Sequence, residues 1–156
     1  MKRLMVVVLA VVLSLCMLPA VTVSASPPIE VSGTFELTSF NVTEAKMANG
    51  NMILTVSLTT EWTGDFVGTD EGVGKMVFHP NGDYTLNTRS TWTGSYLDGP
   101  IGTMDLNTSS KGNDFTGVFK GRITVISSTD GLAGLHGVLT ITGPPNTYSG
   151  KIHFDP

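Results

Sequence analysis

Apolar and polar residues alternate along most of the chain, and a period of two is typical of half-buried β-strands. The alternation is clearest at residues 53–62, where Leu54, Val56, Leu58 and Trp62 share one face. Applied to the whole sequence, the pattern contains no helical period long enough to predict a helix. It predicts eight strands, at residues 31–38, 53–62, 65–78, 84–96, 102–109, 115–127, 135–142 and 147–154.

Clusters of Gly, Asn, Asp and Pro lie between these strands, and such residues favour tight turns. They include Asn49-Gly50, Asn81-Gly82, Asp98-Gly99 and residues 143–146. Short connections favour a meander, and a meander with an even number of strands can close on itself and remove its exposed edges. We therefore predict an all-β fold, a closed eight-stranded antiparallel β-barrel, with a two-sheet β-sandwich as the alternative.

A short unit occurs three times, beginning at Trp62, Trp92 and Phe115: an aromatic residue, Thr, Gly, any residue and a second aromatic residue. Aromatic residues four apart on a strand face the same way, so each unit places two rings beside a glycine. We predict that the rings cover the bare backbone of facing glycines, with an aromatic-lined ligand pocket as the alternative. In the predicted sixth strand, Phe115 and Phe119 are expected to face inward.

The N-terminus has the order of a secretory signal. Lys2 and Arg3 precede an apolar run at residues 4–18, and small residues follow, with Val23 and Ala25 at positions −3 and −1 of a cleavage site. The apolar run is shorter than the about 20 residues that a membrane span needs.

We therefore expect a signal peptide at residues 1–25, a lead-in linker at residues 26–30 and a single barrel domain at residues 31–156. The mature protein is expected to be secreted or periplasmic, with no membrane attachment after cleavage. An uncleaved N-terminal anchor and a lipoprotein attached through Cys16 are the alternatives.

The composition of the chain excludes several kinds of functional site. Cys16 is the single cysteine and lies in the apolar run, so the mature chain would have no disulfide, no thiol nucleophile and no cysteine-ligated zinc. The formal net charge is −4 and falls to −6 once Lys2 and Arg3 are removed, with only 14% of residues charged. A thinly charged acidic chain lacks the clustered Lys and Arg that nucleic-acid binding requires. We expect no nucleic-acid partner.

The titratable residues give few candidates for chemistry. The histidines His79, His136 and His153 lie singly on three predicted strands without metal-ligand spacing, so we expect neither a metal site nor a cofactor. The acidic residues at positions 61, 65, 70 and 71 are expected to be solvated turn residues beside glycines, with acid–base chemistry as the alternative.

Asp105 and Arg89 are the candidate catalytic residues, because both are charged and lie in the middle of predicted strands. If they face the barrel interior, they form either a structural ion pair or a polar anchor for a ligand.

Three stretches resemble the bacterial family known as domain of unknown function 3224: residues 62–72 (WTGDFVGTDEG), residues 92–99 (WTGSYLDG) with Gly102-Thr103, and residues 130–137 (DGLAGLHG). The resemblance runs from Val31 to Phe154, and its motifs are specific in combination. That family is similar in fold to plant allene oxide cyclases, which are eight-stranded barrels with an apolar cavity. The resemblance therefore implies a barrel, and it implies no reaction.

These observations favour a binding module for a small apolar ligand held inside the barrel. An isomerase or cyclase-type enzyme, with Asp105 or Arg89 as its polar group, is one alternative. A structural or interaction protein with a filled core is another. The residues expected to line the ligand site are Trp62, Tyr84, Trp92, Tyr96 and Phe119.

Overall fold

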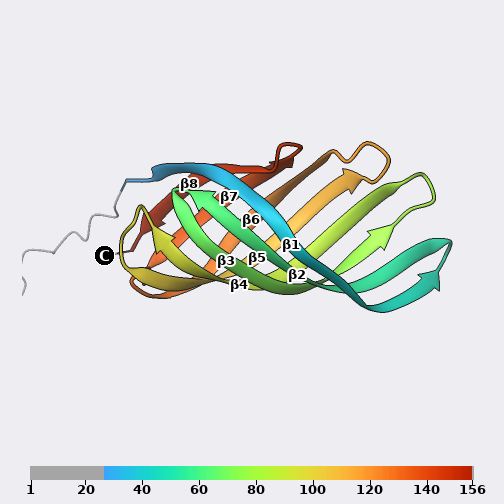
Figure 1. Ribbon diagram of the computed structural model, residues 1–156, viewed down its shortest axis with the longest axis horizontal. Helices are drawn as coiled ribbons and strands as arrows, with labels where there is room; N and C mark the ends of the chain where they lie inside the picture. The colour runs from blue at the N-terminus through green and yellow to red at the C-terminus, as the bar shows by residue number, and fades with distance from the viewer. Residues whose placement is uncertain (1–26, 156) are drawn as a thin grey trace, which may run out of the picture.

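Eight antiparallel strands form a closed barrel in the computed structural model, which describes residues 27–155 (Figure 1). Each strand pairs with the next along the chain, and β1 closes the ring by pairing with β8. The predicted all-β fold and the closed ring are thus confirmed, whereas the predicted signal peptide lies outside the described residues. The strands are β1 (Ile29–Ala48), β2 (Asn51–Gly64), β3 (Phe66–Phe78), β4 (Asp83–Tyr96), β5 (Ile101–Asn113), β6 (Phe119–Asp130), β7 (Leu135–Gly143) and β8 (Thr147–Phe154).

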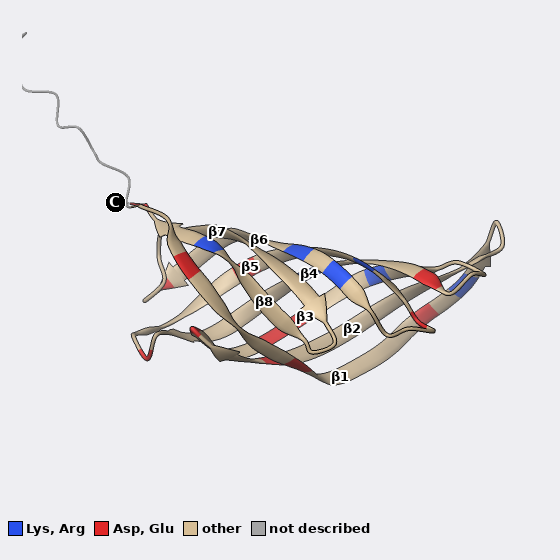
Figure 2. Cartoon of the chain, turned by 90° about the horizontal axis from the view of Figure 1, so that it is seen from above, with Lys and Arg blue, Asp and Glu red and all other residues tan. Residues whose placement is uncertain are grey.

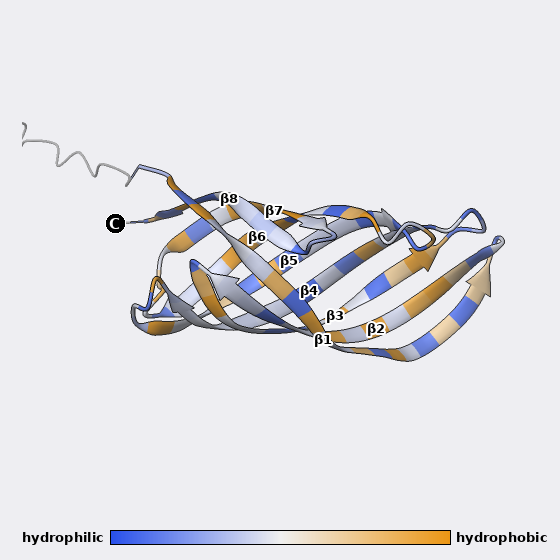
Figure 3. Ribbon diagram, turned by 45° about the horizontal axis from the view of Figure 1, so that its top comes forward, coloured by the Kyte–Doolittle hydropathy of each residue, from blue (hydrophilic) through white to orange (hydrophobic). Residues whose placement is uncertain are grey.

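The strand registers place every second residue inside the barrel, as the alternating hydropathy in Figure 3 illustrates. Trp62 of β2 lies opposite Phe35 of β1 on one side and Gly68 of β3 on the other. Gly68 in turn faces Gly94 of β4, so one layer of inward positions runs around the ring. Residues on the same face of β2 as Trp62 therefore point inward, as the alternation predicted.

Two groups of buried side chains fill the interior. The larger group occupies one end of the barrel and includes Trp92, which is completely buried. Trp92 packs edge-to-face against Phe66, with ring centroids 5.6 Å apart and planes at 77°. A β-carbon added at Gly94 would lie 2.6 Å from the Trp92 ring, so this ring covers bare glycine backbone as predicted. The smaller group consists of Leu54, Val56 and Met76, with Phe78, Tyr84 and Leu86 packed against it.

The wall of the barrel is incomplete along β1. Strand β8 pairs with β1 only as far as Thr34, and the rest of β1 continues with β2 as a long hairpin (Figure 1). Extra residues at the register shifts near Thr38 and Thr43 keep the apolar side chains on the inner face of this hairpin. These side chains have few neighbours to cover them. Their exposed fractions are 47% for Leu37, 41% for Phe40, 50% for Val42 and 70% for Met47.

Three sequence predictions differ from the structure. The first strand extends to Ala48 rather than ending at residue 38, and it begins at Ile29, within the predicted linker. Phe115 does not face inward: it lies in the β5–β6 turn with 78% of its surface exposed. The backbone amides of Phe115 and Thr116 donate to the Asn113 side chain, which holds this turn.

Charged side chains are scattered along the strands rather than gathered into one patch (Figure 2). Within residues 27–155, no helix is long and apolar enough to cross a membrane. The same residues contain no group of three or more His, Cys, Asp or Glu side chains placed to hold a metal ion.

Candidate functional site

A cavity of about 220 Å³ lies between the two groups of buried side chains. Its walls are mainly apolar and aromatic, and they also include the hydroxyl groups of four Ser and Thr residues and one carboxyl group. The lining also includes Leu37 and Phe40 of the partly exposed β1 hairpin and Asn146 of the β7–β8 turn, so the cavity reaches the gap where β1 leaves β8. The aromatic lining residues are Phe35, Phe40, Trp62, Tyr84 and Phe119.

The cavity exists because small residues occupy the inward positions in the middle of four consecutive strands. Gly74 of β3 faces Thr88 of β4, and Thr88 faces Thr108 of β5. Ser110 of β5 then faces Gly121 of β6. Small eight-stranded barrels are just wide enough for large side chains to fill or for one small ligand to occupy. A belt of Gly, Ser and Thr between two apolar layers leaves that space open.

Asp70 is the one carboxylate in the lining of the cavity. It lies in the middle of β3, opposite Thr60 of β2 and Trp92 of β4, and only 6% of its surface is exposed. The prediction that Asp70 is a solvated turn residue is therefore wrong, whereas its neighbours Glu61 and Glu71 are exposed as predicted. A residue at an inward position of a strand points into the barrel whatever its charge, because the register fixes its direction.

A short hydrogen-bond chain ends at this carboxyl group. The indole Nε1–H of Trp62 donates to Thr60 Oγ1 at 2.9 Å, and the Thr60 hydroxyl donates to Asp70 Oδ2 at 3.4 Å. Beside it, three buried polar atoms have no hydrogen-bond partner among the described residues: Asp70 Oδ1, Ser90 Oγ and Trp92 Nε1. Buried polar atoms in folded proteins are nearly always paired, so three unpaired atoms on residues of two neighbouring strands are unusual.

Burial raises the pKa of the Asp70 carboxyl group above its ordinary value. The nearby hydroxyls of Ser90 and Thr60 lower this pKa in part, although the Ser90 hydroxyl does not complete a hydrogen bond. No positively charged group contributes to the shift. Asp70 is thus an acid held inside an apolar cavity without a cationic partner.

The five predicted ligand-site residues divide into two sets. Trp62, Tyr84 and Phe119 line the cavity. Trp92 and Tyr96 point inward but pack with the larger core group, so neither lines the cavity. Three of the five residues therefore line the cavity, and the belt of small hydroxyl residues was not predicted.

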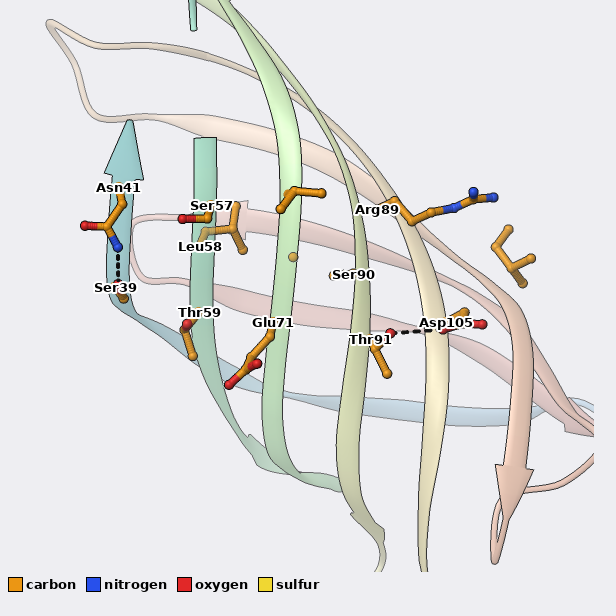
Figure 4. Close-up of a pocket in the computed structure, with 13 residues that line it drawn as sticks. Ser39, Asn41, Ser57, Leu58, Thr59, Glu71, Arg89, Ser90, Thr91 and Asp105 are labelled. Atoms are coloured by element: carbon orange, nitrogen blue, oxygen red, sulfur yellow. Dashed lines mark hydrogen bonds between the residues drawn. The ribbon is translucent and has the colours of Figure 1, made fainter. Parts of the chain in front are cut away.

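The two candidate catalytic residues, Asp105 and Arg89, lie outside the barrel. Both are exposed, and both line an open outer hollow of about 610 Å³ (Figure 4). Asp105 accepts hydrogen bonds from Thr91 Oγ1 at 3.1 Å and Ser127 Oγ at 2.7 Å. These hydroxyls lower the pKa of the Asp105 carboxyl group. Neither residue faces the interior, as an ion pair or a ligand anchor inside the barrel would require, because the inward positions beside them belong to Ser90 and Leu106.

Two histidines form a pair that the sequence did not predict. His136 and His153 lie opposite each other on β7 and β8, with stacked rings 5.7 Å apart. Asp155 approaches both rings, at 3.1 Å from His136 Nε2 and 3.8 Å from His153 Nε2. The cluster is on the outer surface and has no connection with the cavity.

Comparison with known proteins identifies the family. The model of a family described as "Protein of unknown function (DUF3224)" matches residues 31–155. A crystal structure of a protein of unknown function from the same family, from Shewanella oneidensis MR-1, matches with a TM-score of 0.66 and 16% sequence identity. The alignment covers 83% of this chain and 99% of that chain, and at this identity it shows the fold alone. No curated protein matches the chain. The match over residues 31–155 shows that this chain belongs to the DUF3224 family.

Proposed function

We propose that the mature chain is an exported binding protein whose barrel holds one small, mainly apolar molecule. The observation that carries the proposal is the cavity of about 220 Å³, walled by aromatic and aliphatic side chains and reaching the gap beside β1. Apolar concave sites with a few placed polar groups are the usual form of small-molecule sites.

The size of the cavity sets the size of the ligand. A dry cavity of about 150 Å³ holds one benzene molecule, so 220 Å³ accommodates roughly nine non-hydrogen atoms. A ligand of that size binds with a Kd of roughly 0.1–1 mM if each atom contributes an ordinary share of the binding free energy. A larger molecule would extend along the exposed inner face of the β1–β2 hairpin, where Leu37 and Phe40 offer apolar contact.

A cavity-filling variant tests this proposal. Thr108 lines the cavity, whereas its neighbour Asn107 is exposed on the outer face. We expect the purified protein to bind cyclohexylmethanol in a calorimetric titration. The variant Thr108→Phe should lose this binding because the ring occupies the cavity, and the matched control Asn107→Phe should retain it. If both variants bind as the unmodified protein does, the ligand is held elsewhere and the proposal fails.

An enzyme of the isomerase type is a second candidate, and one observation favours it. Such an enzyme needs a proton donor or acceptor in the cavity, and Asp70 lies there with a raised pKa. The candidate catalytic residue is therefore Asp70, in place of Asp105 and Arg89. Replacing Asp70 with Asn leaves binding of the neutral probe cyclohexylmethanol intact in a simple carrier and abolishes turnover of any substrate in an isomerase.

A further inference from the structure

We propose that the ligand of this barrel is a cation, a small primary amine with an apolar body, and that its ammonium group pairs with Asp70. The inference rests on the proposed function, because it names the chemical class of the molecule that the cavity binds. It starts from an imbalance of charge inside the barrel.

Asp70 is the only Asp or Glu that is buried among residues 27–155, and no Lys, Arg or His in that part of the chain is buried. Arg89 and Lys75, its nearest basic neighbours in the sheet, are exposed on the outer face. The other titratable groups inside are the tyrosines at positions 84, 96 and 148, and burial raises the pKa of each so that all stay neutral. Residues 27–155 therefore supply no cationic partner for a charge on Asp70.

Position 70 carries a carboxyl group rather than an amide or a hydroxyl, and this also favours a charged ligand. An asparagine at position 70 would hydrogen-bond to Thr60 and to a neutral ligand at a smaller desolvation cost. What aspartate adds is a negative charge, and a buried charge is normally retained with a partner of opposite sign. A cationic ligand would supply that partner when it binds.

The surroundings of Asp70 suit an ammonium group. A primary ammonium has three N–H donors. The Thr60 hydroxyl lies beside the carboxyl group, and the lining of the same cavity also carries the hydroxyls of Thr88 and Ser110. The aromatic rings of Trp62 and Phe35 line the same cavity, and ring faces attract cations. A carboxylate ligand would find no basic residue there and would meet the Asp70 carboxyl group, so we expect fatty acids and other anions not to bind at this site.

The unpaired atoms beside Asp70 add a second reason. Asp70 Oδ1 is buried without a hydrogen bond, while Oδ2 accepts from Thr60. The terminal torsion of an aspartate is broad, so the carboxyl group can turn to offer an oxygen to the cavity. The hydroxyls of Ser90 and Thr60, which lower the pKa of Asp70 in part, would then stabilise the ionised form.

Three probes with the same ring test the inference: cyclohexylmethylamine, cyclohexylmethanol and cyclohexanecarboxylate. Each is titrated calorimetrically near pH 7.5 into the mature protein, into Asp70→Asn and into the outer-face control Asp105→Asn. We expect the amine to bind the mature protein and the control roughly tenfold or more tightly than the alcohol, because a charge-assisted hydrogen bond is the stronger one. We expect the carboxylate not to bind.

The outcomes separate the inference from the proposed function. In Asp70→Asn the amine should lose its advantage while the alcohol still binds. In the mature protein, binding of the amine should weaken as the pH falls and Asp70 takes up a proton, whereas binding of the alcohol should stay constant. Equal or tighter binding of the alcohol in the mature protein overturns the cationic ligand and leaves the binding cavity in place. Failure of both the amine and the alcohol to bind overturns the proposed function itself.

Discussion

Replacing Asp70 with asparagine removes the charge from the barrel interior while preserving the shape of the side chain. In the ligand-free protein this charge has no cationic partner, and Oδ1 has no hydrogen bond within residues 27–155. An unsatisfied buried polar group costs about 1–3 kcal/mol. The asparagine keeps an oxygen for Thr60 and places an N–H₂ donor beside Ser90, so Asp70→Asn should raise the free energy of unfolding at pH 8 by about 1–2 kcal/mol.

The pH dependence follows from the raised pKa of Asp70. Between the unfolded pKa, about 3.9, and the higher folded pKa, the native protein binds more protons than the unfolded chain. The stability of the unmodified protein therefore falls as the pH rises through this window, and Asp70→Asn lacks that decrease. The two proteins should have nearly equal stability below about pH 4 and should differ fully once the pH exceeds the folded pKa.

Urea unfolding at a series of pH values, followed by tryptophan fluorescence, measures this difference. A gain of 1–2 kcal/mol corresponds to a rise of roughly 3–8 °C in Tm for a domain of this size. Asp105→Asn is the matched control: hydrogen bonds lower the pKa of Asp105, so its contribution is present at neutral pH and is lost as the pH falls. The reasoning is refuted if Asp70→Asn is less stable than the unmodified protein at pH 8, or if both lose stability equally with rising pH.

Three further predictions concern the core, a buried hydroxyl group and the N-terminus. Trp92→Ala should cost about 3–5 kcal/mol in urea unfolding because the ring is fully buried, whereas Phe115→Ala should change stability by less than about 0.5 kcal/mol; equal effects would contradict the assigned burial. Tyr148→Phe should cost about 1–3 kcal/mol, because the Tyr148 hydroxyl accepts the backbone N–H of Phe66 at 2.9 Å, and an unchanged midpoint would show that this bond contributes nothing. Mass spectrometry of the protein from its own source should find a chain that starts at Ser26, and a chain retaining residues 1–25 would argue against cleavage.

The alternation of apolar and polar residues predicted the fold because each strand of a closed barrel has one face toward the interior and one face toward solvent. It failed where the alternation is broken. In β1 the extra residues at Thr38 and Thr43 change the spacing of inward side chains from two to three, so Leu37 is followed by Phe40, and Val42 by Ala45. The predicted strand therefore ended at residue 38, and the open hairpin beside the cavity was not expected.

The candidate site was only partly predictable. Alternate residues of a strand share a face, so Asp70 lies on the same face of β3 as Phe66 and Met76. This spacing can be read from the sequence alone. An acid close to glycines resembles a turn residue, and that local signal misled the prediction. The same alternation places Arg89 on the opposite face from Trp92. The size of the cavity could not be predicted, because it depends on how small side chains from four strands lie together in space.

The most direct test of the central claim is an NMR titration of the ¹⁵N-labelled mature protein with cyclohexylmethylamine, up to the solubility limit of the probe. The account predicts that the Trp62 indole N–H and the backbone amides of Thr60, Asp70 and Thr108, all lining residues, shift together and saturate. Signals of the outer face, such as Asp105, should stay in place. Shifts confined to the outer face, or no shift at any concentration, would contradict a ligand-binding cavity inside the barrel.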